Sequence, residues 1–287
     1  MIFRLFVLTG VILVLIGPVF SANPVLTTLD KAILQQKLEK FSKEKSIPMG
    51  ELVLKIGLDF LNTPYVAKTL DKTKEELLVI NLSELDCTTF AENCIALART
   101  IKSSHPDADR FCAEIENLRY RGGKLDGYSS RLHYFSEWIL DNDQRHNVIA
   151  ITSQMGGKTL PINLNFMSTH PHEYPQLIND PETTSKIKLI EERVSAQKFC
   201  FIPADQFEST EKTIENGDIV TLTTSIPGID VSHVGILFRK DKRVYLLHAS
   251  SSAQKVVIST EPFSQYLTKS KKTTGIMVAR PIDTIAN

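Results

Sequence analysis

The sequence has no excess of charge of either sign. Its 287 residues contain 33 Lys and Arg against 33 Asp and Glu, so the formal net charge is zero. Because affinity for a phosphate backbone needs a basic surface, we expect no nucleic-acid partner. No repeat at a fixed period and no low-complexity tract is visible. The hydrophobic content of 42% allows one large domain or two small ones.

Long apolar runs are absent except at the N-terminus. Residues 5–20 are almost entirely apolar, and Ser21 and Ala22 follow them. The run is shorter than the roughly 20 residues that a membrane span requires, and a Gly-Pro pair breaks it. The pattern predicts a secretory signal peptide over residues 1–22, cleaved after Ser21 or Ala22. We therefore expect export to the periplasm, or beyond it to the cell exterior, with no stable membrane span in the remaining chain, 23–287.

Cysteine is scarce, with four residues in the whole chain. An oxidising compartment allows a disulfide, and Cys112 and Cys200 could form one, but two cysteines offer no spacing pattern that decides the question. Cys94 lies seven residues after Cys87 on the same predicted helix, and we interpret it as a core packing residue. Cys87 is the remaining cysteine, and it is the candidate for a catalytic role.

Complete metal and nucleotide motifs are also absent. His170-Pro171-His172 has no further ligand at a recognisable spacing, and the chain has no H-E-x-x-H, so we interpret it as a loop. Residues 156–159 resemble the end of a phosphate loop, but Thr152 stands where the first glycine is required. We expect no metal and no cofactor.

Leu85 to Glu92 places a cysteine where a helix begins. Apolar residues then recur at the spacing of one buried helical face; they are Phe90, Cys94, Leu97, Ala98 and Ile101. Asp86 is the expected N-cap, with Thr89 in the first turn. Because free backbone N–H groups and the helix dipole favour a thiolate, we expect the pKa of the Cys87 thiol to lie below about 8.5. The stretch predicts a nucleophile at Cys87.

A cysteine at a helix start also has a simpler explanation. Free cysteines are among the most buried residue types and commonly behave as small hydrophobes. A catalytic role therefore depends on a base elsewhere in the chain that folding brings to the thiol.

Two histidines of the C-terminal third are the candidate bases. Residues 231–238 and 244–249 are predicted strands joined by the polar loop 240–243. With a loop of even length, Gly235 faces His248, and His233 lies diagonal to it on the same face. The glycine would then leave open space between the imidazoles. A loop of odd length would separate the rings, and a strand histidine is often structural.

Other segments give the fold class. Hydrophobic spacing predicts helices over 29–46, 49–61 and 136–142, and strands over 77–80, 219–223, 256–258 and 275–279. Helices that pack on an antiparallel sheet make an α+β protein.

Residues 128–135 are dense in aromatic and hydrogen-bonding side chains. Arg131, His133 and Tyr134 stand there, and such clusters are typical of recognition surfaces. A partly buried helix carrying Trp138 on its core side would look much the same. We take the three residues as candidate substrate contacts.

Together these features resemble the N-acetylmuramoyl-L-alanine amidase-like branch of the NlpC-type papain-like cell-wall hydrolases. The resemblance covers about residues 50–281 and rests on four motifs in the same order; they are Leu85–Phe90, Ser130–Phe135, Asp230–Gly235 and Leu246–Ser251. Each motif alone is weak, whereas the ordered set is specific. It implies a papain-like α+β fold in which a nucleophile-bearing helix packs on an antiparallel sheet, in one catalytic domain with an insertion over about 106–203 that shapes the groove.

The resemblance also implies roles for single residues. Cys87 would be the nucleophile, His233 the general base and His248 the third residue that orients the base. Tyr65 matches the Thr-Pro-Tyr motif of the family, where its hydroxyl would bind substrate or shape the oxyanion site. In the wider superfamily the Asp before the cysteine binds the free amine of a stem-peptide alanine. Cleavage of the sugar–alanine bond leaves no such amine, so Asp86 would then be only a cap.

The implied activity is thiol-dependent hydrolysis of peptidoglycan fragments (muropeptides) between N-acetylmuramic acid and L-alanine. Two alternatives stay open. A stem-peptide endopeptidase that cuts between D-glutamate and diaminopimelate would use the same three residues, and a cell-wall-binding protein would keep the groove without turnover. Asn62 stands where the family often has glycine, and Ala91 where valine is common; both departures concern substrate preference, not the reaction class.

Overall fold

The structure is a computed structural model that describes residues 24–283. The predicted signal peptide, residues 1–22, lies outside the described residues. Within 24–283 there is no helix whose length and apolar content would let it cross a bilayer.

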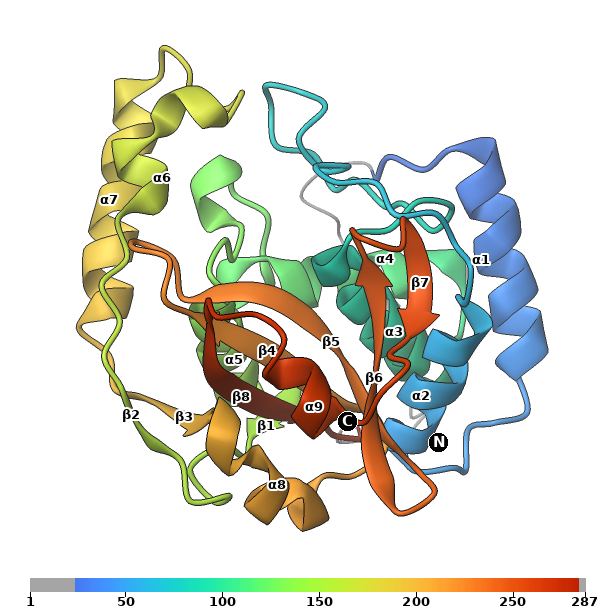
Figure 1. The fold of residues 1–287 in the computed structure, drawn as a ribbon. Coiled ribbons are helices and arrows are strands. Elements are labelled where there is room, and N and C mark those ends of the chain that lie inside the picture. Colours follow the sequence, from blue (N-terminus) through green and yellow to red (C-terminus); the bar gives the residue numbers. More distant parts are fainter. Residues whose placement is uncertain (1–23, 284–287) are drawn as a thin grey trace, which may run out of the picture.

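An eight-stranded antiparallel sheet lies at the centre of the molecule (Figure 1). Seven strands follow the order β2-β3-β8-β4-β5-β6-β7, and β1 pairs with β8. The strands are β1 (Val148–Ala150), β2 (Lys158–Leu160), β3 (Phe199–Pro203), β4 (Asp218–Thr224), β5 (Val231–Lys240), β6 (Arg243–Ser250), β7 (Lys255–Ile258) and β8 (Thr273–Pro281). The predicted α+β class with an antiparallel sheet is confirmed.

Helices cover both faces of this sheet. The α-helices of the described residues are α1 (Thr28–Phe41), α2 (Met49–Asp59), α3 (Cys87–Lys102), α4 (Ala108–Arg119), α5 (Phe135–Gln144), α6 (Phe166–Thr169), α7 (Pro181–Ser195), α8 (Phe207–Thr210) and α9 (Phe263–Leu267). Figure 1 shows α3 and α4 behind the sheet and α9 in front of it. The helices predicted over 29–46, 49–61 and 136–142 are present as α1, α2 and α5.

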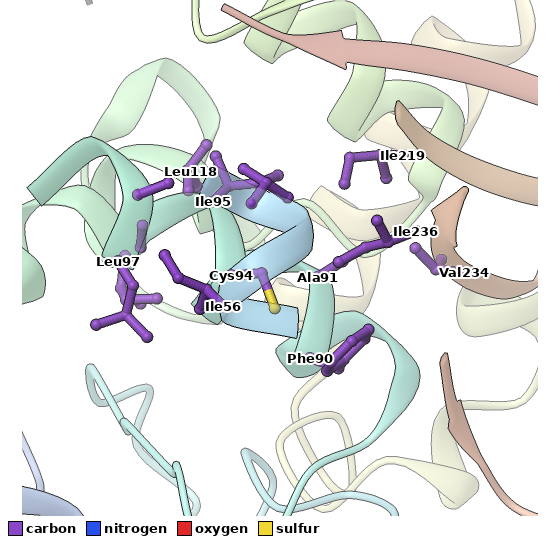
Figure 2. Close-up of a cluster of buried hydrophobic side chains, with 14 of the residues drawn as sticks. Ile56, Phe90, Ala91, Cys94, Ile95, Leu97, Leu118, Ile219, Val234 and Ile236 are labelled. Atoms are coloured by element: carbon purple, nitrogen blue, oxygen red, sulfur yellow. The ribbon is translucent and has the colours of Figure 1, made fainter. Parts of the chain in front are cut away.

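The main hydrophobic core lies between α2–α5 and the sheet. Figure 2 shows part of it, where Ile56 of α2, Cys94 of α3 and Ile236 of β5 gather. Cys94 is fully buried, as predicted for a packing residue. Phe207 and Phe263 bring α8 and α9 onto the opposite face of the sheet in a second cluster. A sheet covered on both faces explains why β4 and β6 are buried along nearly their whole length.

The β5–β6 hairpin has the predicted register. Ile236 pairs with Leu247, and Lys240 pairs with Arg243. The loop is therefore the two residues Asp241 and Lys242, shorter than the predicted 240–243. Both have positive φ, as a two-residue turn needs in order to match the twist of its strands.

The predicted strand over 77–80 is wrong. Val79 forms an isolated bridge with Val25, and only the backbone around that one pair is hydrogen-bonded. Leu78 and Ile80 are buried in the main core. An apolar run can thus be buried in the core without forming a β-strand, because burial and strand pairing are separate requirements.

The segment 106–203 has two parts. α4 and α5 belong to the main core and β1–β3 belong to the sheet. α6 and α7 form a cluster of their own with Tyr128 and Tyr134, and Figure 1 shows them at one side of the sheet.

A buried ionic network holds the loop that follows Tyr65. Arg131 binds Glu76 through two hydrogen bonds, with its Nε 2.8 Å from Oε1 and its Nη2 2.6 Å from Oε2. Its Nη1 lies 2.7 Å from Asp71 Oδ1, and the Tyr120 hydroxyl also donates to Glu76. The side chains of Arg131 and Glu76 are 10% and 1% exposed. This loop is therefore held to the body of the protein by charges that have little access to water.

We predict that Arg131→Met destabilises the protein by about 3–5 kcal/mol, because it leaves two carboxylates without their cation in a mostly buried place. Urea unfolding measures the loss. Lys186→Met is the matched control: its ion pair with Glu182 is exposed at the surface, so the unfolding midpoint should stay unchanged. Equal midpoints for the two variants would contradict the prediction.

Candidate active site

Cys87 is the first residue of α3, as predicted. Asp86 is the N-cap: its Oδ1 accepts hydrogen bonds from the backbone N–H of Thr89 at 2.8 Å and from the Thr89 hydroxyl at 2.8 Å. The Asp86 backbone N–H donates in return to Thr89 Oγ1 at 2.9 Å, which completes a capping box. The carboxylate of Asp86 is thus engaged in fixing the helix start that presents the thiol.

His233 and His248 are bonded to each other. His233 Nε2 lies 2.6 Å from His248 Nδ1, and the rings meet edge to face with centroids 4.8 Å apart. The predicted open space between the imidazoles is therefore wrong. A Cβ added to Gly235 would lie 2.6 Å from Leu246 Cδ1 and 3.1 Å from His248 Cβ. The glycine permits close approach of the two strands and opens no cavity.

The sulfur of Cys87 lies against β5 beside this pair. The Val234 backbone N–H is within hydrogen-bonding reach of the thiol, and Cys87 and His233 line the same hollow. Because Nε2 of His233 is bound to His248, Nδ1 is the ring nitrogen left to accept a proton. That role requires the tautomer in which His233 Nε2–H donates to His248 Nδ1.

The predicted lowering of the Cys87 pKa is wrong. Cys87 is partly buried, and the loss of hydration of its thiol together with the nearby Asp86 carboxylate raises the pKa of the thiol to about 11. Hydrogen bonds from the Val234 backbone and Thr88 favour the thiolate but do not outweigh the loss of hydration. A position at a helix start is not enough to ionise a thiol that has lost hydration and lies beside a carboxylate.

Burial also keeps the histidine pair neutral. It lowers the pKa of His233 to about 3, with His248 adding to the effect, and it lowers the pKa of His248 to about 4. At neutral pH the resting site therefore holds a thiol and an uncharged imidazole. Such a pair transfers its proton as the sulfur attacks, in general-base fashion.

The hollow in front of the thiol has a volume of about 220 Å³, and His133 and Tyr134 are among the residues that line it. Their role as substrate contacts stays a prediction. His133 Nε2 lies 2.9 Å from the carbonyl of Tyr128, and burial lowers the pKa of this ring to about 3. The Tyr134 hydroxyl donates to Glu191 at 2.6 Å. Both side chains are thus held in place by protein partners and present fixed surfaces to the hollow.

Three other residues predicted to bind substrate are not in the lining of that hollow: Asp86, which caps α3, Tyr65 and Arg131. Tyr65 forms a bridge with Leu85, and the pKa of its hydroxyl is raised by burial and by the charges of Cys87 and Asp86, so it stands beside the helix start. Arg131 is enclosed in the network with Glu76 and Asp71. Its role as a substrate contact stays a prediction.

Several residues of the site carry no signal in the sequence. Tyr266 of α9 packs edge to face on His248 at 5.5 Å, and the pKa of its hydroxyl is raised by burial, by Glu261 and by Cys87. Phe166 and Met167 of α6, with Tyr174, form one wall of the hollow. They come from short helices and loops, where no periodicity marks a functional face.

The cysteines and histidines form no other centre within residues 24–283. All four cysteines are free, including Cys112 and Cys200. No group of three or more His, Cys, Asp and Glu side chains in this part of the chain is arranged to hold a metal ion.

A family model described as N-acetylmuramoyl-L-alanine amidase-like (AmiA-like) matches residues 55–276. The chain belongs to this family. The match contains Cys87, His233 and His248 together with most of the sheet. No curated protein matches the sequence.

Solved structures agree with the family assignment. The chain is similar to an N-acetylmuramoyl-L-alanine amidase from Bacteroides uniformis, with 39% identity over 81% of this chain and 98% of the other, at a TM-score of 0.76. A protein from Bacteroides fragilis provisionally named a xylanase is also 39% identical, over 79% of this chain and 99% of its own, at a TM-score of 0.76. A Legionella pneumophila protein that contains a domain of unknown function shares the fold. It is 17% identical, over 88% of this chain and 97% of its own, at a TM-score of 0.67.

The raised thiol pKa predicts a specific pH dependence for alkylation of this amidase-like protein. The rate at which iodoacetamide modifies Cys87 should be low at neutral pH and should climb steadily toward pH 11, because only the thiolate reacts. Peptide mass spectrometry after timed labelling measures it, with half-buried Cys200 as an internal reference. A rate that is already high and flat below pH 6 would reveal a preformed thiolate–imidazolium pair and contradict the assignment.

Proposed function

We propose that the protein is an exported, cysteine-dependent peptidoglycan amidase that hydrolyses the bond between N-acetylmuramic acid and L-alanine in muropeptides. The observation that carries this proposal is the contact of the helix-start thiol with the strand whose histidine is bonded to a second imidazole. The family match supports the choice of bond. Helix α3 packs on β5 and β6, and this packing supports a papain-like fold.

The proposed reaction begins with the neutral site. Cys87 Sγ attacks the lactyl carbonyl carbon of the muramic acid while its proton passes to Nδ1 of His233. The imidazolium that forms is stabilised by the hydrogen bond from its Nε2–H to His248 Nδ1. Backbone N–H groups at the start of α3, including that of Cys87, hold the oxyanion. His233 then returns the proton to the alanine nitrogen as the C–N bond breaks, and water hydrolyses the thioester that remains on the sugar.

The other predicted residues support this chemistry around the thiol. Asp86 caps α3 and fixes the nucleophile, which agrees with a substrate that has no free alanine amine. Tyr65 stands beside the helix start and is assigned to the substrate or the oxyanion. His133 and Tyr134 form the wall of the hollow that receives the muropeptide. No metal ion enters the proposed reaction.

A glycosidase, the activity suggested by the xylanase name of one similar structure, finds less support at this site. Glycoside hydrolysis ordinarily needs two carboxyl groups that flank the bond. The hollow has a single carboxylate in its lining, that of Asp230. Asp230 Oδ2 accepts from the Ser136 backbone N–H at 2.7 Å, and its Oδ1 accepts from that of Val231 at 2.7 Å. This carboxylate holds backbone and is not placed as half of a catalytic pair.

We predict that Cys87→Ala lowers muropeptide hydrolysis by at least about 1,000-fold, since the residual rate comes only from binding and oxyanion stabilisation. Product formation is followed by liquid chromatography of muropeptide digests. Cys200→Ala is the matched control and should keep the full rate. Addition of a metal chelator should change nothing. Activity that survives Cys87→Ala but is lost with the chelator would refute the proposal.

The bond that is cut is tested by mass spectrometry of the products from a defined disaccharide tetrapeptide. The proposed amidase yields a free disaccharide and an intact tetrapeptide. The alternative endopeptidase would instead leave L-alanyl-D-glutamate on the sugar. A third outcome, in which the purified protein binds the muropeptide without any product, would favour the non-catalytic alternative.

A further inference from the structure

Tyr266 lies on the face of the sheet toward which His248 points. Val244 and Leu246 of β6 belong to the same buried cluster as Phe263 of α9. Because successive side chains of a strand alternate between the two faces, His248 points to that face as well. The ring of Tyr266 meets the His248 imidazole edge to face, with centroids 5.5 Å apart and an angle of 76° between the planes. The helix α9, in front of the sheet in Figure 1, thus places an aromatic ring beside the second imidazole.

The His248 ring has a single polar partner. Its Nδ1 lies 2.6 Å from His233 Nε2, and within residues 24–283 no other hydrogen bond engages this imidazole. The last side-chain torsion of a histidine is broad and roughly two-fold. A half-turn about it exchanges Nδ1 with Cδ2, so that a carbon would face His233. The orientation of His248 therefore depends on the side chains that pack against its ring.

The ring of Tyr266 is itself held by packing. It stacks on Phe263 with centroids 6.2 Å apart and planes 19° apart. Phe263 in turn meets Phe207 edge to face at 5.0 Å, and both phenylalanines are fully buried. Among the described residues no hydrogen bond engages the Tyr266 hydroxyl. The ring, not the hydroxyl, is thus the part of Tyr266 that is tied to the protein.

The segment that leads into α9 is anchored to β6 close to His248. The Ser259 backbone N–H donates to the Leu246 carbonyl at 2.8 Å, and the Leu246 N–H donates to Ser259 Oγ at 3.1 Å. Ser259 Oγ donates onward to the carbonyl of Glu261 at 2.8 Å. Leu246 stands two residues before His248 on the same face, so the strand that carries the imidazole also fixes the start of the helix that packs on it.

We propose that Tyr266 is a positioning residue of the active site, whose aromatic ring holds the His248 imidazole in the orientation that accepts the hydrogen bond from His233. Its effect on rate rests on the proposed amidase function, whereas its effect on the histidine pair does not. When His233 takes the proton of Cys87, its Nε2–H needs the lone pair of His248 Nδ1. An imidazole that turns freely offers this lone pair only part of the time, so the attack slows while substrate binding stays the same.

The first test examines the histidine pair in the resting protein, without substrate. Long-range ¹H–¹⁵N NMR spectra should show His248 as one tautomer, with Nδ1 unprotonated and Nε2 protonated. Tyr266→Phe keeps the ring and should keep this single tautomer. Tyr266→Leu keeps apolar bulk on Phe263 but removes the ring, so we expect a mixture of tautomers.

Tyr245→Leu is the matched control for this test. Tyr245 is another aromatic residue of β6, but it packs with Phe238 against the main core, on the opposite face of the sheet. Its removal should leave the single His248 tautomer intact. A single tautomer that also persists in Tyr266→Leu would refute the positioning role.

The second test separates kcat from KM in muropeptide hydrolysis. Tyr266→Leu should lower kcat about five- to tenfold, the upper range for loss of one aromatic pair, and leave KM nearly unchanged. Tyr266→Phe should retain the parent kcat, and a loss as large as that of the leucine variant would contradict a role of the ring. If the parent enzyme hydrolyses no muropeptide, the proposed function fails, and the tautomer spectra alone decide whether Tyr266 positions His248.

Discussion

The hydrogen bond between His233 and His248 is the interaction on which the proposed chemistry depends. It occupies Nε2 of His233 at 2.6 Å and so leaves Nδ1 as the nitrogen that can serve the thiol. The bond exists because a two-residue turn sets the register of β5 and β6, and because Gly235 lets the strands approach closely. A shift of one residue would turn one ring to the other face of the sheet, and the base would lose its partner.

Loss of hydration is the second constraint, and it acts on the Cys87 thiol and on the two histidines together. Burial raises the pKa of Cys87 and lowers the pKa values of His233 and His248. Each shift disfavours a charged form, so the enclosed site rests in its neutral state. Charge then develops only as the sulfur attacks, where the second imidazole and the backbone N–H groups of α3 can stabilise it. The Asp86 carboxylate strengthens this preference while it fixes the position of the thiol.

The surroundings of the site come from segments far apart in the chain. The Arg131 network fixes the loop after Tyr65, and Phe166 and Tyr174 line the hollow in front of the thiol. The loop between β4 and β5 adds Ile229 and Asp230 to the same lining. The strands and α3 thus provide the reacting groups. The residues that would determine substrate specificity lie on loops and short helices, as is common for enzymes built on a rigid scaffold.

Much of the fold and the catalytic candidates follow from local patterns. The apolar spacing after Cys87, the Asp86 cap and the alternation across the β5–β6 hairpin are short-range signals, because helix period, capping and register depend on neighbours in sequence. The isolated bridge at Val79 and the edge contact of Tyr266 with His248 could not be predicted, since they depend on which distant surface each side chain meets. The same holds for the ionisation of Cys87: the sequence determined that the thiol opens a helix, but only the tertiary structure decided how much hydration the thiol loses, and this desolvation outweighs the effect of the helix terminus.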